Sequence, residues 1–509
     1  MGVDPRTPVI VGVGQFTESI DDPGYRGMSA VELATEAAKS ALADTGANPD
    51  EVAKAVDAVV GLRQFEISAG MPAPLGKSNN YPRSVMQRLG AQPARSVIEP
   101  VGGQGPQKLV TEFGTAIANG ERDVVMIIGS ENGSTLRYYA KRDDKPDFTE
   151  HIDGQLEDRG HQIFQYVSEY TITHGLTGAP VQYGLLDNAR RGRLGLSVAD
   201  YRRAMAELFA PLSKVAAKNA YSSSPVERSV DEIVTVTDDN RMICDPYPRL
   251  LVARDQVNQG AAAVMMSVEA ARRLGVPEEK WVYLHGHSDM VEQGLLERAD
   301  LGASPATVHA AREALRVAGI GVDDIATFDL YSCFPFPVFV MCEALGIDGD
   351  DPRGLTLTGG LPYFGGPGNS YSLHAIAETV AEMRDRPGQF GLVGANGGTM
   401  SKYSVGIYST LPIDWRADRS AVLNDEVAAL PTVTVTEKAD GPATVETYSV
   451  RYDWPVRTGV IVGRLVADNS RFMALTEDDD LLGLLSDGDP LGARIIVTTT
   501  EQGNRAHLA

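Results

Sequence analysis

The residue types that carry covalent or metal chemistry are scarce in this chain. Its three cysteines, Cys244, Cys333 and Cys342, have neither the spacing of a zinc site nor the even number needed for complete disulfide pairing. Thiols of this kind are most often buried. His285 and His287, in the sequence LHGHS, have no evident third ligand to complete a metal site. We therefore interpret both histidines as strand residues and expect no bound metal.

One turn has the surroundings of a reactive site without a reactive side chain. The sequence IEPVGGQGPQKLV, residues 98–110, is expected to lie between a strand and a helix. A helix N-terminus offers unpaired N–H groups and a partial positive charge, which would stabilise a thiolate or an oxyanion. The stretch contains no Cys, Ser, His or Asp. Its acid, Glu99, precedes the turn, and its lysine, Lys108, follows the turn.

Length and composition exclude several classes of function. The chain has 509 residues, enough for three domains, with 43% hydrophobic and 22% charged residues. Its net charge of −22 argues against a surface that binds nucleic acid or anionic lipid, although a local basic cluster could hold a small anion. No segment reaches the roughly 18 apolar residues of a membrane span. We expect a cytoplasmic protein.

The elements that would position a site alternate between strand and helix. The segment VIVGVG (residues 9–14) predicts a buried strand, and residues 28–46 predict a helix with a Ser29–Glu32 capping box and Gly46 at its end. Residues 56–61 predict the next strand. This alternation favours an α/β fold with a mostly parallel sheet covered by helices.

An internal repeat indicates that the α/β region is duplicated. The segment AAKSALADTGANPDEV (37–52) aligns without gaps on AAREALRVAGIGVDDI (310–325). Further along each copy, GGQG (102–105) and GGPG (365–368) both precede a predicted helix and strand. Two matches in the same order predict two similar halves that face each other across a pseudo-twofold axis.

Two regions depart from this repeat. The first, rich in Tyr, Arg and short helices, is interpreted as an insertion, and the β-rich tail after Trp415 as a small antiparallel β-barrel. The expected domains are a first half (1–133 and 243–280), an inserted loop domain (134–242), a second half (281–415) and the barrel (416–509).

Four ordered segments resemble one family of enzymes. They are VIVGVGQF, NGERDVVMIIGSENGS, VNQGAAAVMMS and DLYSCF, and over about residues 6–411 the chain resembles the thiolase superfamily, closest to its sterol-carrier-protein-type branch. The resemblance implies the thiolase fold, with duplicated βαβαβαββ halves in five layers. It also implies lipid metabolism and an acyl-CoA ligand, with coenzyme A as part of the substrate and no separate cofactor. A homodimer is implied as well, unless the added C-terminal domain leaves a monomer.

The resemblance also shows which catalytic positions have changed. Gly102 falls on the acylated cysteine, Gly366 on the histidine that activates it, and Ala395, or Gly394 if the frame slips, on the proton-transfer cysteine. Tyr331 falls on the oxyanion-binding position of the H-D-C-F motif. A thiolate needs a base or a positive field to form, and an oxyanion needs aimed donors. Ordinary acetyl-CoA acetyltransferase (thiolase) chemistry is therefore not expected.

Three residues remain as candidate catalytic groups. Cys333 either faces the cleft as a nucleophile or is a buried thiol, and His374 either points toward the site or packs between helices. Tyr331 either transfers a proton, as in thiolase-like retro-aldol lyases, or fills the emptied cavity.

Binding residues are predicted in two groups. The glycines allow a thioester or pantetheine chain to approach backbone N–H groups, or else they serve tight packing; they are Gly103, Gly105, Gly397 and Gly398. The arginines lie in NARRGRLG of the inserted region, where the family binds coenzyme A, and either bind phosphate or form a solvated helix face; they are Arg190, Arg191 and Arg193.

The sequence thus predicts a thiolase-like protein that binds an acyl-CoA or a related thioester without the usual catalytic set. Two alternatives remain. One is a retro-aldol or other C–C lyase acting on a coenzyme A thioester through Tyr331 or His374, and the other is a non-catalytic protein that binds a partner.

Overall fold

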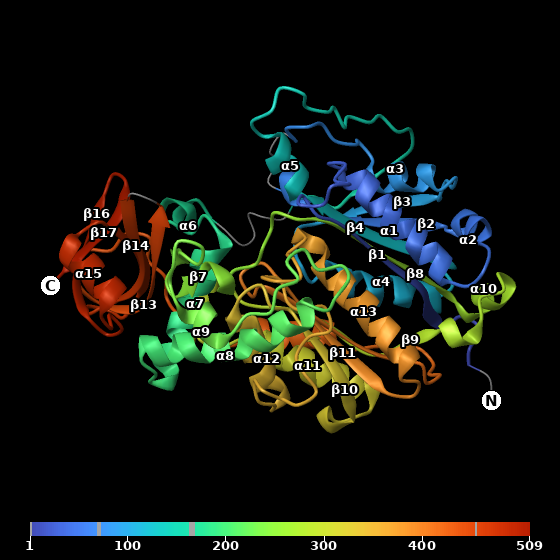
Figure 1. The fold of residues 1–509 in the computed structure, drawn as a ribbon. Helices are drawn as coiled ribbons and strands as arrows, with labels where there is room; N and C mark the ends of the chain where they lie inside the picture. The colour runs from blue at the N-terminus through green and yellow to red at the C-terminus, as the bar shows by residue number, and fades with distance from the viewer. Residues whose placement is uncertain (1–2, 69–72, 162–167, 454–455) are drawn as a thin grey trace.

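The computed structural model describes residues 3–68, 73–161, 168–453 and 456–509. Figure 1 shows an α/β body that contains both halves of the repeat, with a small β-rich domain at the C-terminal end. Within the described residues no helix is both long and apolar enough to cross a membrane.

The two halves of the α/β body repeat one strand order. The first half has the order β2-β4-β8-β1, with β3 beyond β2, and the second has the order β10-β11-β12-β9. In both, the first pair is parallel and the next two pairs are antiparallel. The predicted duplication is confirmed. These strands are β1 (Pro8–Glu18), β2 (Ala58–Leu62), β3 (Arg95–Glu99), β4 (Val124–Asn132), β8 (Asn258–Ser267), β9 (Val282–Val291), β10 (Ile325–Leu330), β11 (Phe390–Gly397) and β12 (Lys402–Ser409).

The helices complete the five layers that the resemblance implies. Two of them, α4 (Gly105–Ala118) and α13 (Tyr371–Asp385), contact strands of both halves and form the middle layer. Figure 1 shows α1 and α11 on opposite sides of the body. The outer helices are α1 (Ala30–Asp44), α2 (Pro49–Ala55), α3 (Tyr81–Arg88), α10 (Val268–Arg273), α11 (Pro305–Ala318) and α12 (Pro335–Leu345).

Local sequence signals account for the equivalent helices α1 and α11. The capping box of α1 is present, since the Ser29 N–H donates to Glu32 at 2.8 Å and the Glu32 N–H donates to the Ser29 hydroxyl at 3.2 Å. Gly46 follows α1 with φ of +72°, and Gly319 ends α11 with φ of +73°. Glycine adopts this left-handed conformation without the steric cost that a Cβ brings, so both helices end where the repeat predicts.

The inserted region lies between β4 and β8 and is mostly helical. Its last two strands extend the sheet of the C-terminal domain, because Cys244 of β6 pairs with Arg451 of β13. The insertion therefore joins the added domain to the body. Its elements are α5 (Gly133–Tyr139), β5 (Glu157–Asp158), α6 (Glu169–Thr173), α7 (Ala179–Leu194), α8 (Val198–Ala216), α9 (Val230–Val234), β6 (Met242–Cys244) and β7 (Tyr247–Pro248).

The C-terminal domain closes into a β-barrel in the order β13-β14-β15-β17-β16, with β16 returning to β13. The prediction of a purely antiparallel barrel is wrong at one pair, because β15 and β17 are parallel. Helix α15 connects β15 to β16 in the sequence. Strands β16 and β17 then form an antiparallel hairpin, and β17 closes the barrel by pairing with β15. The elements are α14 (Ser420–Ala428), β13 (Gly441–Asp453), β14 (Val456–Leu465), β15 (Arg471–Thr476), α15 (Asp479–Asp487), β16 (Arg494–Thr500) and β17 (Gly503–Leu508).

A buried arginine, Arg471, forms hydrogen bonds between the barrel and the body. Arg471 is fully buried and donates to Glu446 of β13 at 2.6 Å. It also donates to the backbone carbonyls of Leu296 and Arg298, at 2.7 and 2.6 Å. Arg298 in turn donates to the carbonyl of Thr399 at 2.9 Å, at the turn after β11. The barrel is thus connected by hydrogen bonds to a turn of the predicted site.

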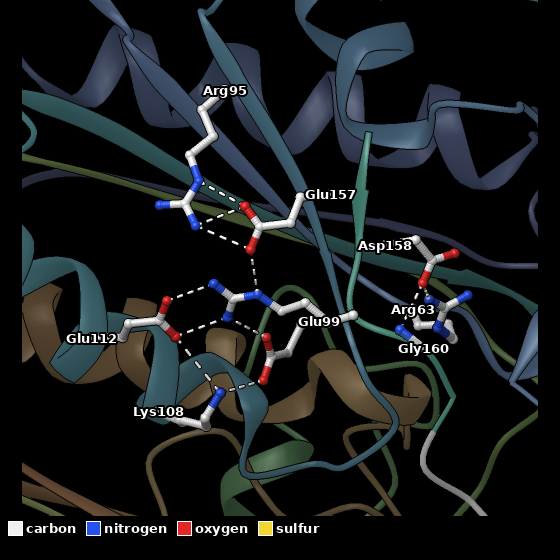
Figure 2. A network of polar contacts seen from close by, with 9 residues as sticks. Arg63, Arg95, Glu99, Lys108, Glu112, Glu157, Asp158 and Gly160 are labelled. Atoms are coloured by element: carbon white, nitrogen blue, oxygen red, sulfur yellow. Dashed lines mark hydrogen bonds and ion pairs between the residues drawn. The ribbon is translucent and has the colours of Figure 1, made fainter. Parts of the chain in front are cut away.

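The outer edge of β3 is covered by a short strand of the insertion and held by ion pairs (Figure 2). Strand β5 pairs in parallel with β3. Arg159, directly after β5, donates to Glu99 at 2.8 Å and to Glu112 at 2.6 Å. Arg95 pairs with Glu157 at 2.7 Å, and Arg63 forms an ion pair with Asp158. An edge strand that would otherwise present unpaired backbone groups is therefore covered.

Candidate functional site

The two glycine turns predicted from the repeat lie against each other. The N–H of Gly102 donates to the side-chain oxygen of Asn369 at 2.9 Å. Asn369 directly follows the second turn, and its amide donates to the carbonyl of Arg63 at 2.6 Å. The Ser372 hydroxyl donates to the carbonyl of Gly103 at 2.5 Å. The N-termini of α4 and α13 therefore meet at the position where the family places its chemistry.

At Gly102, where the resemblance predicts the acylated cysteine, the space is filled by a neighbouring side chain. Gly102 is buried and has φ of +152°, in the region that favours glycine. A Cβ placed on Gly102, or one placed on Gly397, would overlap the Oε1 atom of Gln104. The carboxamide of Gln104 thus occupies the space where a cysteine side chain would project.

At Gly366, where the resemblance predicts the activating histidine, the nearest atoms belong to the segment before β8. A Cβ on Gly366 would have its nearest neighbours at 3.2 Å, the carbonyl oxygen of Arg254, and at 3.5 Å, the Cβ of Ala253. The N–H of Gly366 donates to that same carbonyl at 2.8 Å. Gly366 therefore lies against the segment that leads into β8.

Ala395 lies in β11 and is completely buried. The next residue, Asn396, is also buried; its amide donates to the Tyr183 hydroxyl at 2.6 Å and contacts the sulfur of Cys333 at 3.8 Å. The predicted glycines Gly397 and Gly398 follow, and the carbonyl of Gly398 accepts a hydrogen bond from Tyr183 at 2.6 Å. The turn after β11 is thus tied to α7 of the insertion.

Tyr331 and Cys333 are brought together just after β10. A Cβ on Gly103 would overlap the Tyr331 hydroxyl, and the Tyr331 ring meets Tyr371 edge-on with centroids 5.4 Å apart. Burial raises the pKa of Tyr331 well above its usual value, and it raises the pKa of the Cys333 thiol to about 12. Both groups are therefore neutral near pH 7, so Cys333 is not a thiolate in this structure.

His374 is placed apart from these two residues. Its Nδ1 is 2.7 Å from Oε1 of Gln15, and its ring packs against Phe364 with centroids 5.2 Å apart. Phe364 contacts Tyr371, which contacts Tyr331, so two aromatic rings lie between His374 and Tyr331. Complete burial lowers the pKa of His374 to about 3. The imidazole is therefore neutral and enclosed.

The predicted phosphate-binding arginines of α7 are engaged by carboxylates. Arg190 pairs with Glu343 at 2.6 Å and stacks over the Phe339 ring at 4.1 Å. Arg191, 1% exposed, pairs with Asp489 of the barrel at 2.9 Å. Arg193 pairs with Glu343 at 3.0 Å. These side chains connect α7 to α12 and to the barrel, and their role in phosphate binding stays a prediction.

A groove of about 1140 Å³ lies beside the site, and the sequence reasoning did not identify it. It carries charges of both signs, but Arg137, Arg241, Arg249 and Arg254 have no carboxylate within 4 Å among the described residues. Its charged and hydroxyl side chains come from the insertion and the segment before β8: Arg137, Ser224, Arg228, Ser229, Asp231, Glu232, Thr235, Thr237, Asp238, Asp239, Arg241, Arg249, Arg254 and Asp255.

Arg254 is the half-buried member of this arginine set. Burial lowers its pKa, and the positive charges of Arg249 and Arg137 lower it further, against the opposing field of Asp21. Arg137 donates to the side chain of Gln256 at 2.7 Å, and Arg249 to the carbonyl of Asp239 at 3.1 Å. Three neighbouring guanidinium groups that repel one another and bond only neutral acceptors are a suitable receptor for a phosphate.

Ala253 and Arg254 form a wall of the groove, and their backbone also contacts the predicted site. The N–H of Ala253 donates to the carbonyl of Cys333 at 3.1 Å, and the N–H of Arg254 donates to the carbonyl of Leu361 at 3.1 Å. The carbonyl of Arg254 accepts from Gly366. The groove therefore reaches the histidine position from outside. Arg249 and Arg254 lie five residues apart before β8, so the sequence shows them as neighbours. Their proximity to Arg137 comes from folding and cannot be recognised from adjacent residues.

The comparisons with known proteins agree with this fold. The crystal structure of a monomeric SCP2-thiolase-like protein type 1 from Mycobacterium smegmatis is 64% identical over 100% of both chains, with a TM-score of 0.88. This chain belongs to the SCP2-thiolase-like protein type 1 family. In agreement, residues 422–502 match the family model of the thiolase-like protein type 1 additional C-terminal domain.

More distant relatives share part of the sequence or the fold of this chain. An acetyl-CoA acetyltransferase of Methanothermobacter thermautotrophicus is 27% identical over 218 residues, which are 38% of this chain and 55% of that protein, so the match spans about half of the relative. The dimeric peroxisomal thiolase of Saccharomyces cerevisiae is 13% identical, with a TM-score of 0.57 over 80% of this chain and 98% of the other. An Ltp2-ChsH2(DUF35) aldolase is 20% identical, with a TM-score of 0.56 and the same coverages. The last two show a shared fold alone.

Proposed function

We propose that this protein binds coenzyme A or an acyl-CoA in the arginine groove and does not catalyse thiolase acyl transfer. The observation that carries the proposal is a set of four groove arginines, Arg137, Arg241, Arg249 and Arg254, that form no ion pair among the described residues, in a groove whose wall contacts Gly366. Coenzyme A carries several phosphates, and guanidinium groups bind phosphate strongly. On the same ground we propose a role in lipid metabolism, in the cytoplasm.

The residue types at the predicted catalytic positions support the proposal that the protein does not catalyse thiolase acyl transfer. Gly102 and Gly366 supply neither a thiol nor a base, and Ala395 supplies no proton carrier. The nearest thiol, Cys333, has its pKa raised by burial to about 12. No observation favours the lyase alternative, because His374 and Tyr331 are separated by aromatic rings and both are neutral.

Replacing Arg254 by methionine is expected to weaken coenzyme A binding about 10- to 100-fold, because it removes a charge-assisted hydrogen bond to phosphate. Isothermal titration calorimetry of the full chain measures the effect. The matched control is Arg386→Met, since Arg386 pairs with Glu382 of α13, neither residue lines the groove, and its loss is expected to leave the affinity unchanged. The proposal is wrong if the wild-type protein shows no coenzyme A binding, or if it cleaves acetoacetyl-CoA in the presence of coenzyme A.

We further propose that the protein is a monomer. The relative from Mycobacterium smegmatis is described as monomeric. The covered edge of β3 supports the same state here, because β5 takes up the backbone positions at which another strand would pair.

Arg159→Ala is expected to release β5 and to make the protein self-associate with increasing concentration, because β3 becomes an open edge. Arg159 joins β5 to Glu99 and Glu112, so no other single change removes as many of these contacts. Sedimentation velocity at several concentrations measures the state. Arg142→Ala, which removes an exposed pair with Asp144, is the control and is expected to stay monomeric. A monomeric Arg159→Ala variant would show that the ion network does not protect the edge.

A further inference from the structure

The turn between β11 and β12, residues 398–401, has a backbone conformation that its own sequence does not favour. Met400 has φ of +51° and is 2% exposed. This left-handed region is uncommon for a residue with a Cβ, so contacts from outside the turn must maintain it. The turn is closed by one hydrogen bond of its own, from the Ser401 N–H to the carbonyl of Gly397 at 3.0 Å. The neighbours of Met400 therefore decide whether the turn keeps its shape.

One set of these contacts comes from Arg298. Its guanidinium donates to the carbonyls of Thr399 and Met400, at 2.9 and 3.3 Å, and to that of Gln293 at 3.0 Å. Arg298 is 2% exposed, forms no ion pair within the described residues, and its Nη1 has no hydrogen-bond partner among them. A buried cation that bonds only carbonyls is costly, so the backbone that carries it must hold it in place.

The barrel holds that backbone. Arg471 of β15 donates to the carbonyls of Leu296 and Arg298. The chain that leads from α14 into the barrel joins the same two arginines, since Thr432 forms a β-bridge with Arg298 and Val435 forms one with Arg471. The position of Arg298 beside the turn is therefore set by the barrel.

The turn in its closed form encloses the Cys333 thiol. The Tyr183 hydroxyl donates to the carbonyl of Gly398 and accepts from the amide of Asn396, both at 2.6 Å. That amide contacts the Cys333 sulfur at 3.8 Å, and Cys333 is 8% exposed. Three barrel side chains belong to the same apolar cluster as Met400 and Cys333: Val460, Val462 and Met473. A movement of the turn would therefore change the surroundings of Cys333.

We propose that the C-terminal barrel is a latch that keeps the 398–401 turn closed and the Cys333 thiol enclosed. The latch consists of Arg471, the backbone of Arg298, and the bonds from the Arg298 guanidinium to the turn. Without Arg471 the support of Arg298 is lost, the turn leaves its left-handed conformation, and Cys333 becomes reachable from solvent. None of these residues lines the arginine groove, so the latch is separate from ligand binding there. The barrel thereby controls access to the predicted site.

The test uses Arg471→Lys in the full chain. Lysine keeps the charge beside Glu446, but its single ammonium cannot replace the guanidinium fork that also reaches two backbone carbonyls of the body. Burial raises the pKa of Cys333 to about 12, so alkylation by iodoacetamide at pH 8 requires opening of the site. The variant is expected to speed alkylation of Cys333 about tenfold relative to that of Cys342, a buried thiol of α12 that serves as the internal reference for unfolding of the body. Mass spectrometry of the digested protein measures both rates.

Arg464→Lys is the matched control. Arg464 pairs with the same Glu446 at 2.7 Å, and it also donates to the carbonyl of Asn469 within the barrel at 3.2 Å. It reaches no residue of the body in the described part of the chain, so both alkylation rates are expected to match the wild type. Equal acceleration of Cys333 in the two variants would overturn the latch, because weakening the barrel alone would then expose the thiol. An unchanged Cys333 rate in Arg471→Lys, or equal acceleration of its two thiols, would overturn it as well.

A second variant tests the connection itself, because coupling between two residues is established only by combining their substitutions. Arg298→Lys weakens the bonds to the turn without changing the charge and is expected to speed Cys333 alkylation by about the same factor as Arg471→Lys. The double variant is expected to be no faster than either single variant. Hydrogen exchange at the Ser401 N–H is expected to follow the same order. Rates that multiply in the double variant would show two independent effects and would contradict the latch.

Discussion

The Arg471→Met variant is expected to lose about 3 kcal/mol or more of its free energy of unfolding, because breaking a buried ion pair leaves its partners without compensation. The guanidinium of Arg471 is completely buried between the barrel and the body. Its removal leaves Glu446 with Arg464 alone and leaves the carbonyls of Leu296 and Arg298 without this donor. Equilibrium urea unfolding followed by circular dichroism measures the change.

The control for this prediction is a substitution of the same type at the surface. Arg203→Met removes ion pairs with Glu207 and Asp231, in which all three side chains are more than half exposed, at 59%, 55% and 86%. Exposed pairs contribute little to stability, so its unfolding curve is expected to lie close to that of the wild type. Equal losses in the two variants would mean that Arg471 does not hold the barrel to the body.

The Gly102→Cys variant, which restores the family's nucleophile, is expected to remain inactive and to lose about 1–3 kcal/mol of stability. The loss arises because φ of +152° is unfavourable for any residue with a Cβ, and because the new side chain must displace Gln104. The thiol would stay neutral, since burial raises the pKa of the neighbouring Cys333 to about 12 and Gly366 supplies no base. Coenzyme A-dependent cleavage of acetoacetyl-CoA and thermal unfolding measure the two effects.

Gly483→Cys is the matched control for the cysteine itself. Gly483 lies in α15, where a Cβ would meet no heavy atom within 4 Å, and its backbone is helical. This variant is expected to unfold like the wild type. Thiolysis or a burst of enzyme acylation by Gly102→Cys, absent from Gly483→Cys, would show that the rest of the thiolase machinery is intact.

Local signals predicted the α/β class of the body and the ends of its helices, but the mostly parallel sheet that they favoured is wrong, because β4, β8, β1, β9, β12 and β11 pair antiparallel in that order. The capping box at Ser29 and the glycines that end α1 and α11 act within one or two turns of chain, so they can be recognised from neighbouring residues alone. The repeat of residues 37–52 at 310–325 predicted the duplicated halves, and the strand order confirms them. The barrel was predicted from its β-rich segments, but the parallel pairing of β15 with β17 depends on how α15 carries the chain across it.

Charge density along the chain did not indicate which arginines are available to a ligand. The run at 190–193 is dense in arginine, yet Glu343 and Asp489, far away in sequence, pair with it. In the described part of the chain, the groove arginines without carboxylate partners are at positions 137, 241, 249 and 254, in two separate segments. Whether a guanidinium is paired depends on carboxylates brought close by folding, and spacing within one segment does not show them.

The sequence by itself predicted that the usual catalytic groups are absent, because the resemblance aligns Gly102, Gly366 and Ala395 with them and residue identity needs no coordinates. Only the tertiary structure decided what surrounds these residues. Gln104 lies where a side chain on Gly102 would project, Tyr331 packs against Gly103, and the backbone of Arg254, which lines the arginine groove, contacts Gly366. The physical reason is that packing and charge pairing join residues hundreds of positions apart, whereas side-chain type is a local property of the chain.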